Sequence, residues 1–221
     1  MGDAAAKAEL FERLAQVGKA MGSGKRLELL DLLVQGPRSV TELAMTSRLG
    51  MTTASSHLQV LKRAGLVAAD REGTTIRYRL AGTDVAALYL QLRTVAATHL
   101  PDVEVASRGY LGTTGGDDTA EIGRVELLRR ARAGEVVVLD VRPASEYAAG
   151  HIPGAVCIPV DELPARLDEL PAGLEVVAYC RGAYCVFAHD AVRFLTAHNR
   201  RAVRLAGGIL EWRVAELPVA A

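Results

Sequence analysis

The hydrophobic pattern of this 221-residue chain changes at residues 111–119, and this change most constrains the fold. Before that segment, apolar residues recur at helical spacing, whereas after it short apolar runs alternate with helical stretches. The segment itself, L-G-T-T-G-G-D-D-T, has no periodicity and is rich in turn-forming residues. The sequence therefore predicts a first domain at residues 1–105, a linker at 106–119 and a second domain at 120–221.

The first half has the pattern of a small helical domain with one hairpin. Ser39 and Glu42 form a capping-box pattern at a helix start, and Gly65 is placed to end a later helix. Helices are predicted at residues 7–20, 25–35, 39–45, 52–63 and 84–100, and hairpin strands at 66–70 and 75–80. Two helices joined by a tight glycine turn and followed by an arginine-bearing hairpin indicate a winged helix-turn-helix.

The second helix of this unit and the hairpin carry the predicted DNA contacts. Hydroxyl and amide side chains suit base edges and phosphate oxygens, and the hairpin is expected to reach phosphates. The predicted contacts are Thr52, Thr53, Ser55, Ser56, His57, Gln59, Lys62, Arg63, Arg71, Thr74, Arg77 and Arg79. Residues 24–80 hold nine Lys or Arg against five Asp or Glu, which agrees with an anionic partner.

The run T-T-A-S-S-H-L-Q-V-L-K-R-A-G-L-V, followed by R-E-G-T-T-I-R-Y-R-L, resembles the ArsR/SmtB family of bacterial repressors over about residues 10–100. This resemblance implies a homodimer whose interface is formed by residues 7–20 and 84–100. It also implies a palindromic double-stranded operator with half-sites roughly 34–36 Å apart.

The residues through which many ArsR/SmtB relatives sense metals are missing from this sequence. The segment S-V-T-E-L-A-M-T has no cysteine, and Asp84 and His99 are too far apart to resemble the other known type of site. His57 is interpreted as a DNA contact or a helix support, and His99 as an interface or cap residue. We therefore predict no metal site and no cofactor, and no sensor in the first half.

The second half has the alternation expected of a largely parallel sheet covered by helices. Strands are predicted near residues 136–139, 155–158, 176–179 and 202–205, and helices near 123–132, 161–169, 185–198 and 208–215. The fold class is thus a mainly α winged helix-turn-helix domain followed by an α/β domain.

The run from Val138 to Pro159, V-L-D-V-R-P-A-S-E-Y-A-A-G-H-I-P-G-A-V-C-I-P, resembles the rhodanese family, as does G-G-I-L-E-W-R from Gly207. The resemblance covers about residues 120–218 and implies a sulfurtransferase fold. The position of its nucleophilic cysteine is Cys180 here, and Asp140 and Arg142 are implied to brace the loop.

Cys180 follows an apolar strand and opens a short loop that leads into a helix. Loop amides and a helix N-terminus favour negative charge, so we expect a lowered pKa for Cys180 and stabilisation of a persulfide anion. Arg181 is expected to add charge for an anionic sulfur donor.

A second thiol, Cys185, closes the same loop, Y-C-R-G-A-Y-C-V-F. It is either a small apolar residue at the helix start or a resolving thiol that attacks a persulfide on Cys180. Cys157 lies within an apolar strand and is expected to be an inert core residue.

The function predicted is a transcriptional regulator, expected to be a repressor, whose cysteine loop senses sulfane sulfur as persulfide or polysulfide. The alternatives are an active sulfurtransferase that uses Cys180 and an arsenite-responsive regulator. No apolar run approaches the roughly 20 residues of a membrane span, and the N-terminus lacks the apolar core of a signal peptide. We therefore expect a cytoplasmic protein with no membrane partner.

Overall fold

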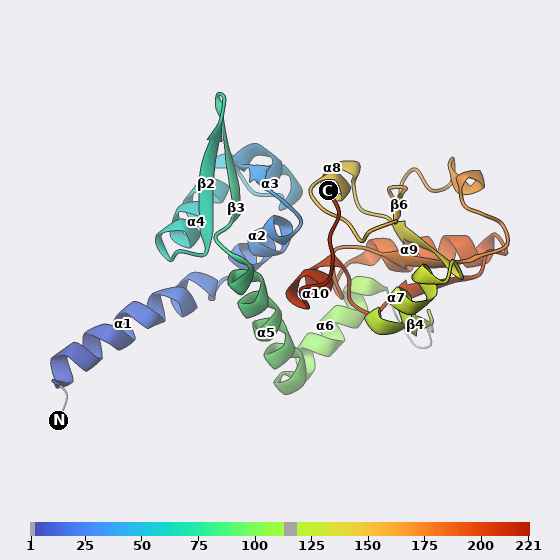
Figure 1. Cartoon of the computed structure of the whole chain (residues 1–221). Coiled ribbons are helices and arrows are strands. Elements are labelled where there is room, and N and C mark those ends of the chain that lie inside the picture. Colours follow the sequence, from blue (N-terminus) through green and yellow to red (C-terminus); the bar gives the residue numbers. More distant parts are fainter. Residues whose placement is uncertain (1–2, 113–118) are drawn as a thin grey trace. The chain divides into compact units, whose positions relative to one another are not determined.

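The structure is a computed structural model that describes residues 3–112 and 119–221 (Figure 1). The chain divides into two compact units, Met1–Tyr89 and Leu90–Ala221. Residues 113–118 of the predicted linker lie outside the described residues, so the linker boundaries stay a prediction. Both predicted fold types are present, one in each unit.

The first unit contains a helix-turn-helix and a three-stranded antiparallel sheet of order β1-β3-β2. The helices are α1 (Ala4–Met21), α2 (Gly24–Val34), α3 (Val40–Thr46) and α4 (Met51–Arg63), and the strands are β1 (Arg38–Ser39), β2 (Val67–Glu72) and β3 (Thr75–Leu80). Strands β2 and β3 form the hairpin that projects as the wing in Figure 1.

Local sequence determines where the two central helices begin. Ser39 and Glu42 form the predicted capping box at the start of α3, with both hydrogen bonds present. Helix α4 begins at Met51, one residue before the predicted start at residue 52, and Gly50 is its N-cap. Leu58 is fully buried beneath α4, which turns the polar face of this helix outward.

Two further helices follow, α5 (Thr83–His99) and α6 (Pro101–Leu111). Helix α5 begins in the first unit, and its residues from Leu90 onward belong to the second. Helix α6 was not predicted, although Pro101 at its first turn and Gly112 after its end, with φ of 68°, are typical helix boundaries.

The second unit is built on a five-stranded, fully parallel sheet of order β4-β8-β7-β5-β6. Its strands are β4 (Glu121–Ile122), β5 (Val136–Asp140), β6 (Val156–Cys157), β7 (Glu175–Tyr179) and β8 (Ala202–Leu205). Strand β7 lies between β5 and β8, and both neighbours pair with it in parallel. The carboxyl end of β7 is therefore at the centre of the edge where parallel sheets place functional residues.

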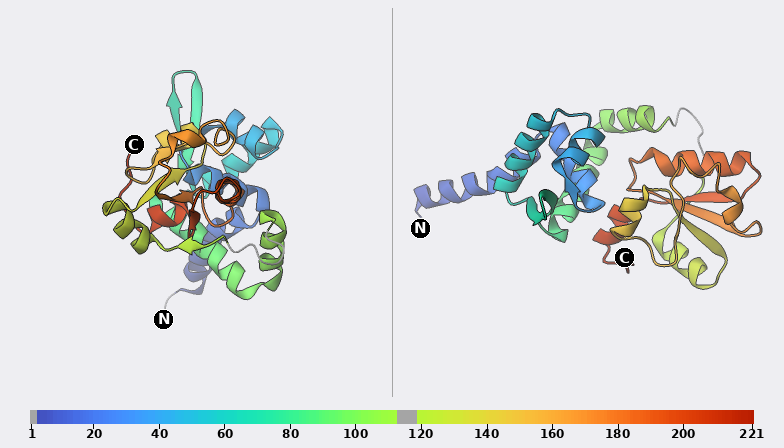
Figure 2. Two further views of the ribbon diagram at one scale, coloured as in Figure 1. Left: turned by 90° about the vertical axis from the view of Figure 1, so that its right-hand side faces the viewer. Right: turned by 90° about the horizontal axis from the view of Figure 1, so that it is seen from above.

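Helices cover both faces of this sheet, as Figure 2 shows. They are α7 (Arg124–Arg132), α8 (Ala144–Ala148), α9 (Val186–Ala197) and α10 (Ile209–Val214). One apolar core lies between the sheet and α9, where Val176 and Ala178 of β7 pack against it. The other lies beneath α7 and α10, where Val177 and Tyr179 face inward. This alternation along β7 is the two-residue period of a strand buried on both faces.

The helix predicted at residues 161–169 is wrong. That segment forms successive turns and a single 3-10 turn, η1 (Leu167–Glu169). Pro164 lies in its middle and has no backbone N–H to donate, and its ring opposes a continuous helix.

Candidate functional site: a DNA-reading face and a buried cysteine loop

The predicted DNA contacts on α4 lie on the face opposite its buried side. Thr52, Thr53, Ser56, Lys62 and Arg63 are exposed, and Ser55, His57 and Gln59 are half-buried. Gln59 donates a hydrogen bond to the Tyr78 hydroxyl of the wing at 3.3 Å. This bond ties the helix to the hairpin and occupies part of the Gln59 amide.

The arginines of the wing are partly neutralised by neighbouring acids. Arg79 pairs with Asp70 at 2.6 Å, and Arg77 pairs with Glu72 at 2.7 Å. Arg71 donates to the Gly73 carbonyl at the hairpin tip, where Thr74 is exposed. The structure thus places all four wing residues on the hairpin, but it restrains the side chains of Arg77 and Arg79 within the protein.

The cysteine loop runs from Cys180, which directly follows β7, to Cys185, the N-cap of α9. Helix α10 holds the start of this loop, because the N–H groups of Ile209 and Leu210 donate to the carbonyls of Cys180 and Arg181. A side chain at Gly208 would lie 2.6 Å from the Gly182 nitrogen. This close approach explains why glycine occurs at that point of the G-G-I-L-E-W-R motif.

Both loop thiols are shielded from solvent, and they contact each other. Cys180 is 1% exposed and Cys185 is 9% exposed. The Cys180 sulfur lies 3.4 Å from the Cys185 carbonyl oxygen, and the two thiols are hydrogen-bonded to each other. The loop therefore brings its two cysteines together, which the sequence left open.

The pKa values of the two thiols are shifted in opposite directions. Burial raises the pKa of Cys180 well above its ordinary value, so the expected lowering at Cys180 is wrong for the reduced loop. The hydrogen bond from Cys180 lowers the pKa of Cys185, and the N–H groups of Arg181 and Phe187 lower it further. Of the two cysteines, Cys185 is therefore the one whose thiolate form is the more favoured.

Arg181 is held by Glu146 of α8, which is buried. Its Nε lies 3.0 and 3.1 Å from the two carboxylate oxygens, and its guanidinium lies 5.2 Å from the Phe187 ring centroid. The positive charge expected to serve a sulfur donor is thus shared with a buried carboxylate, and it fixes the loop backbone next to Cys180.

Asp140 and Arg142 form a fully buried ion pair, 2.6 Å apart between Nη2 and Oδ2. Asp140 also accepts a hydrogen bond from the Tyr179 hydroxyl at 2.6 Å, and Arg142 donates to the Gly150 carbonyl at 2.9 Å. Because Tyr179 directly precedes Cys180, this network positions the end of β7. Neither charged side chain reaches the surface.

Cys157 on β6 is half-buried, and burial raises the pKa of its thiol. Within residues 3–112 and 119–221, no group of three His, Cys, Asp or Glu is arranged to hold a metal ion. In the same ranges, no helix is both long and apolar enough to cross a membrane.

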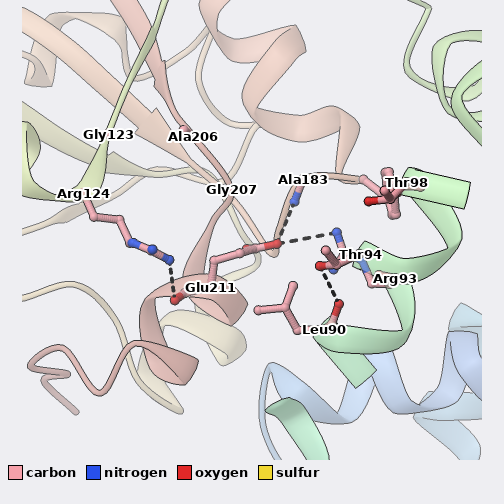
Figure 3. A pocket seen from close by; sticks show the side chains of 12 residues that line it. Leu90, Arg93, Thr94, Thr98, Gly123, Arg124, Ala183, Ala206, Gly207 and Glu211 are labelled. Carbon is pink, nitrogen blue, oxygen red and sulfur yellow. Dashed lines mark hydrogen bonds and ion pairs between the residues drawn. The ribbon is translucent and has the colours of Figure 1, made fainter. Parts of the chain in front are cut away.

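A cavity of about 460 Å³ adjoins the far side of the cysteine loop, within the second unit (Figure 3). Ala183 and Tyr184 of the loop line it, together with Arg93 of α5 and Glu211 of α10. Glu211 Oε1 accepts a hydrogen bond from the Ala183 N–H at 3.4 Å and lies 3.5 Å from Arg93 Nη2. Figure 3 shows Ala183, Arg93 and Glu211 converging from three separate elements.

Sequence reasoning missed Glu146, Tyr179, Arg93 and Glu211 as parts of this site. Tyr179 was predictable in principle, since it is the last residue of a buried strand and carries a hydroxyl that needs a partner. Glu146, Arg93 and Glu211 lie 35, 91 and 28 residues from the loop residues that they contact, which are Arg181, Tyr184 and Ala183. Nothing in their local patterns indicates such pairings.

These features define a two-domain transcriptional regulator with a rhodanese-like second domain. The family model for the bacterial regulatory protein, arsR family, matches residues 23–69, and that for the rhodanese-like domain matches residues 124–215. The HTH-type transcriptional regulator Rv0324 of Mycobacterium tuberculosis is 54% identical over 96% of this chain and 92% of its own length. The chain belongs to this family of ArsR-type regulators with a rhodanese-like domain.

Two matches cover one unit each. A protein named sulfurtransferase from Allochromatium vinosum is 34% identical over 42% of this chain and 86% of its own length. The solved winged helix-turn-helix DNA-binding domain Mb0332 from Mycobacterium bovis, described as homodimeric, is 49% identical and has a TM-score of 0.43. It covers 45% of this chain and 93% of that chain.

Proposed function

We propose that this regulator is a repressor that senses sulfane sulfur, as persulfide or polysulfide, through Cys180 and Cys185. The observation that carries the proposal is the contact of Cys180 with Cys185, whose carbonyl oxygen lies 3.4 Å from the Cys180 sulfur, in a loop at the carboxyl end of the central strand. The pKa of the Cys185 thiol is lowered, while burial raises the pKa of the Cys180 thiol. Such a pair is suited to accept one sulfur atom and then to resolve it.

The first step forms a persulfide on Cys180. The Cys180 sulfur attacks the terminal sulfur of a donor persulfide, R–S–SH, and the S–S bond of the donor breaks. The thiolate RS⁻ leaves, and the Cys180 proton passes to the Cys185 thiolate through their hydrogen bond. Cys180 then carries S–SH, and Cys185 is a neutral thiol. When this S–SH group loses its proton, the backbone N–H groups of Gly182 and Ala188, which already bond the Cys180 sulfur, support the negative charge.

The second step releases sulfide. After Cys185 loses its proton to solvent, its thiolate attacks the inner sulfur of the Cys180 persulfide, and HS⁻ leaves. The product is a Cys180–Cys185 disulfide, which changes the shape of the loop. The lowered pKa of Cys185 favours this step because the thiolate is the nucleophile.

In this proposal the DNA-binding form is a homodimer. Leu10, Phe11 and Leu14 of α1 are more than half exposed, and Leu88 and Val95 of α5 are exposed as well. Exposed apolar helix faces of this kind are typical of an interface between subunits. Side chains of α4 would then enter the major groove, and the wing would reach phosphates.

The test is a binding titration of full-length protein on a duplex selected from a random library. We expect polysulfide to weaken binding about 100-fold, which corresponds to about 2.7 kcal/mol of differential affinity. Cys180→Ser should bind DNA normally and fail to respond. An unchanged affinity of the wild-type protein, or a full response in Cys180→Ser, contradicts the proposal. Cys157→Ser serves as the matched control, because Cys157 lies outside the loop.

A second candidate function is sulfur transfer by repeated turnover, which the similarity to the Allochromatium vinosum protein favours. Steady consumption of thiosulfate with cyanide as acceptor, lost in Cys180→Ser, would support it. Capture of arsenite by the thiol pair is a third candidate, favoured by the proximity of the two sulfurs. Mass spectrometry of treated protein distinguishes added sulfur from added arsenic.

A further inference from the structure

Arg93 connects helix α5 to the cysteine loop, directly through Tyr184 and indirectly through Glu211. Its guanidinium lies 4.4 Å from the ring centroid of Tyr184, the residue before Cys185. It also lies 3.5 Å from Glu211, whose carboxylate accepts the Ala183 N–H. Its Nη1 is 3.4 Å from the position that a Cβ on Gly182 would occupy. Arg93 thus contacts the middle of the loop while only 9% exposed.

One turn earlier, the part of α5 that belongs to the first unit contacts helix α2. Tyr89, four residues before Arg93, donates a hydrogen bond from its hydroxyl to Asp31 of α2 at 3.2 Å. Residues i and i+4 of a helix lie on one face, one above the other. One helical face therefore carries a contact to α2 at Tyr89 and a contact to the cysteine loop at Arg93.

The two ends of the loop differ in how firmly they are held. Cys180 and Arg181 are fixed by backbone hydrogen bonds from α10 and by the Arg181–Glu146 ion pair. Ala183 and Tyr184 instead rely on side-chain contacts with Glu211 and Arg93. A bond between Cys180 and Cys185 would draw the loop ends together, so the displacement falls on Ala183 and Tyr184.

We propose that Arg93 is the positioning residue through which the state of the cysteine loop reaches helix α5 and DNA affinity. This inference rests on the proposed function, because it requires a sulfur-dependent change in the loop. In the reduced loop the Arg93 guanidinium is largely shielded from solvent between the Tyr184 ring and the Glu211 carboxylate. Its contact with the ring is lost when Tyr184 moves. In this proposal Arg93 takes part neither in the thiol chemistry nor in DNA binding.

The experiment measures the ratio of DNA Kd after and before polysulfide treatment, with thiol masses recorded on the same samples. Wild-type protein is expected to give a ratio of about 100. Arg93→Ala should keep the reduced-state Kd and the mass changes of the loop cysteines, but its ratio should fall to about 1. Arg124→Ala is the matched control, since Arg124 lines the same cavity without contacting the loop, and it should respond as wild type.

Tyr184 offers a second, milder pair of variants. Tyr184→Phe retains the aromatic ring under Arg93 and should respond normally, whereas Tyr184→Leu should lose the response. Fluorescence of Trp212, the chain's one tryptophan, verifies that each variant is folded in the second unit.

The outcomes separate the two proposals. A wild-type ratio of 1 overturns the sensing function itself. A wild-type ratio near 100 that persists in both Arg93→Ala and Tyr184→Leu overturns only the role of Arg93. Loss of the mass changes in Arg93→Ala also overturns it, because Arg93 would then act in the thiol chemistry.

Discussion

The two units of this protein carry sites of opposite construction. The first presents polar side chains on the open face of α4 and on the wing, where a large partner can reach them. The second buries the two cysteines of its loop, and ion pairs and backbone hydrogen bonds hold that loop. Contacts with DNA thus require only an oriented surface. Control of the pKa of a thiol requires a fixed and desolvated environment.

The strongest test of this contrast is Asp140→Ala, which leaves the buried charge of Arg142 without its carboxylate partner. We expect a loss of about 3–5 kcal/mol from the free energy of unfolding of the second unit. Urea unfolding followed by Trp212 fluorescence measures this loss, because Trp212 is the chain's one tryptophan and lies in the second unit. Glu169→Ala, which removes an exposed partner of Arg166, should leave the midpoint nearly unchanged. A comparable shift in both variants would refute the argument from burial.

In the first unit the largest effect is expected from Leu58→Ala, which opens a cavity beneath α4. Such truncations cost about 2–5 kcal/mol. Far-UV circular dichroism should show early unfolding with loss of DNA binding, while the Trp212 transition stays in place. Val60→Ala on the exposed side of the same helix is the control. A shift of the Trp212 transition in Leu58→Ala would show that the units do not unfold separately.

The acidities of the two thiols sharpen the contrast further. Because a thiol reacts with iodoacetamide only as its thiolate, alkylation begins as the pH rises through its pKa. Cys185, with its lowered pKa, should therefore be labelled at lower pH than Cys180, whose pKa is raised. Cys180→Ala removes the hydrogen-bond donor and should shift the labelling of Cys185 to higher pH. Peptide mapping by mass spectrometry reports both sites, and labelling of Cys180 first would contradict the assignment.

The smallest effects are expected on the DNA-reading face. Lys62→Ala removes one exposed positive charge from the end of α4, so the salt dependence of log Kd should fall by about 1 unit of slope. Arg79→Ala should change it less, because Arg79 is already paired with Asp70. The measurement is Kd over a series of salt concentrations. Equal slopes for the two variants would show that the Asp70 pairing is broken when DNA binds.

The sequence was sufficient for the elements whose reasons are local. The capping box at Ser39 and the alternating core of β7 were predictable, because caps and strand periodicity depend on neighbouring residues. The helix predicted at 161–169 was wrong because the apolar spacing was given more weight than Pro164. Helix α6 buries none of its residues, so no core-facing apolar stripe marks it in the sequence.

The sequence alone determined that the chain has a winged helix-turn-helix half and a rhodanese-like half, with two cysteines five residues apart in a loop after a buried strand. Only the tertiary structure decided that these thiols touch, which of them is the more acidic, and which residues hold their loop. The physical reason is that acidity depends on burial and on partners brought close by folding. Glu146 and Arg93, far from the loop in sequence, contact the loop residues Arg181 and Tyr184.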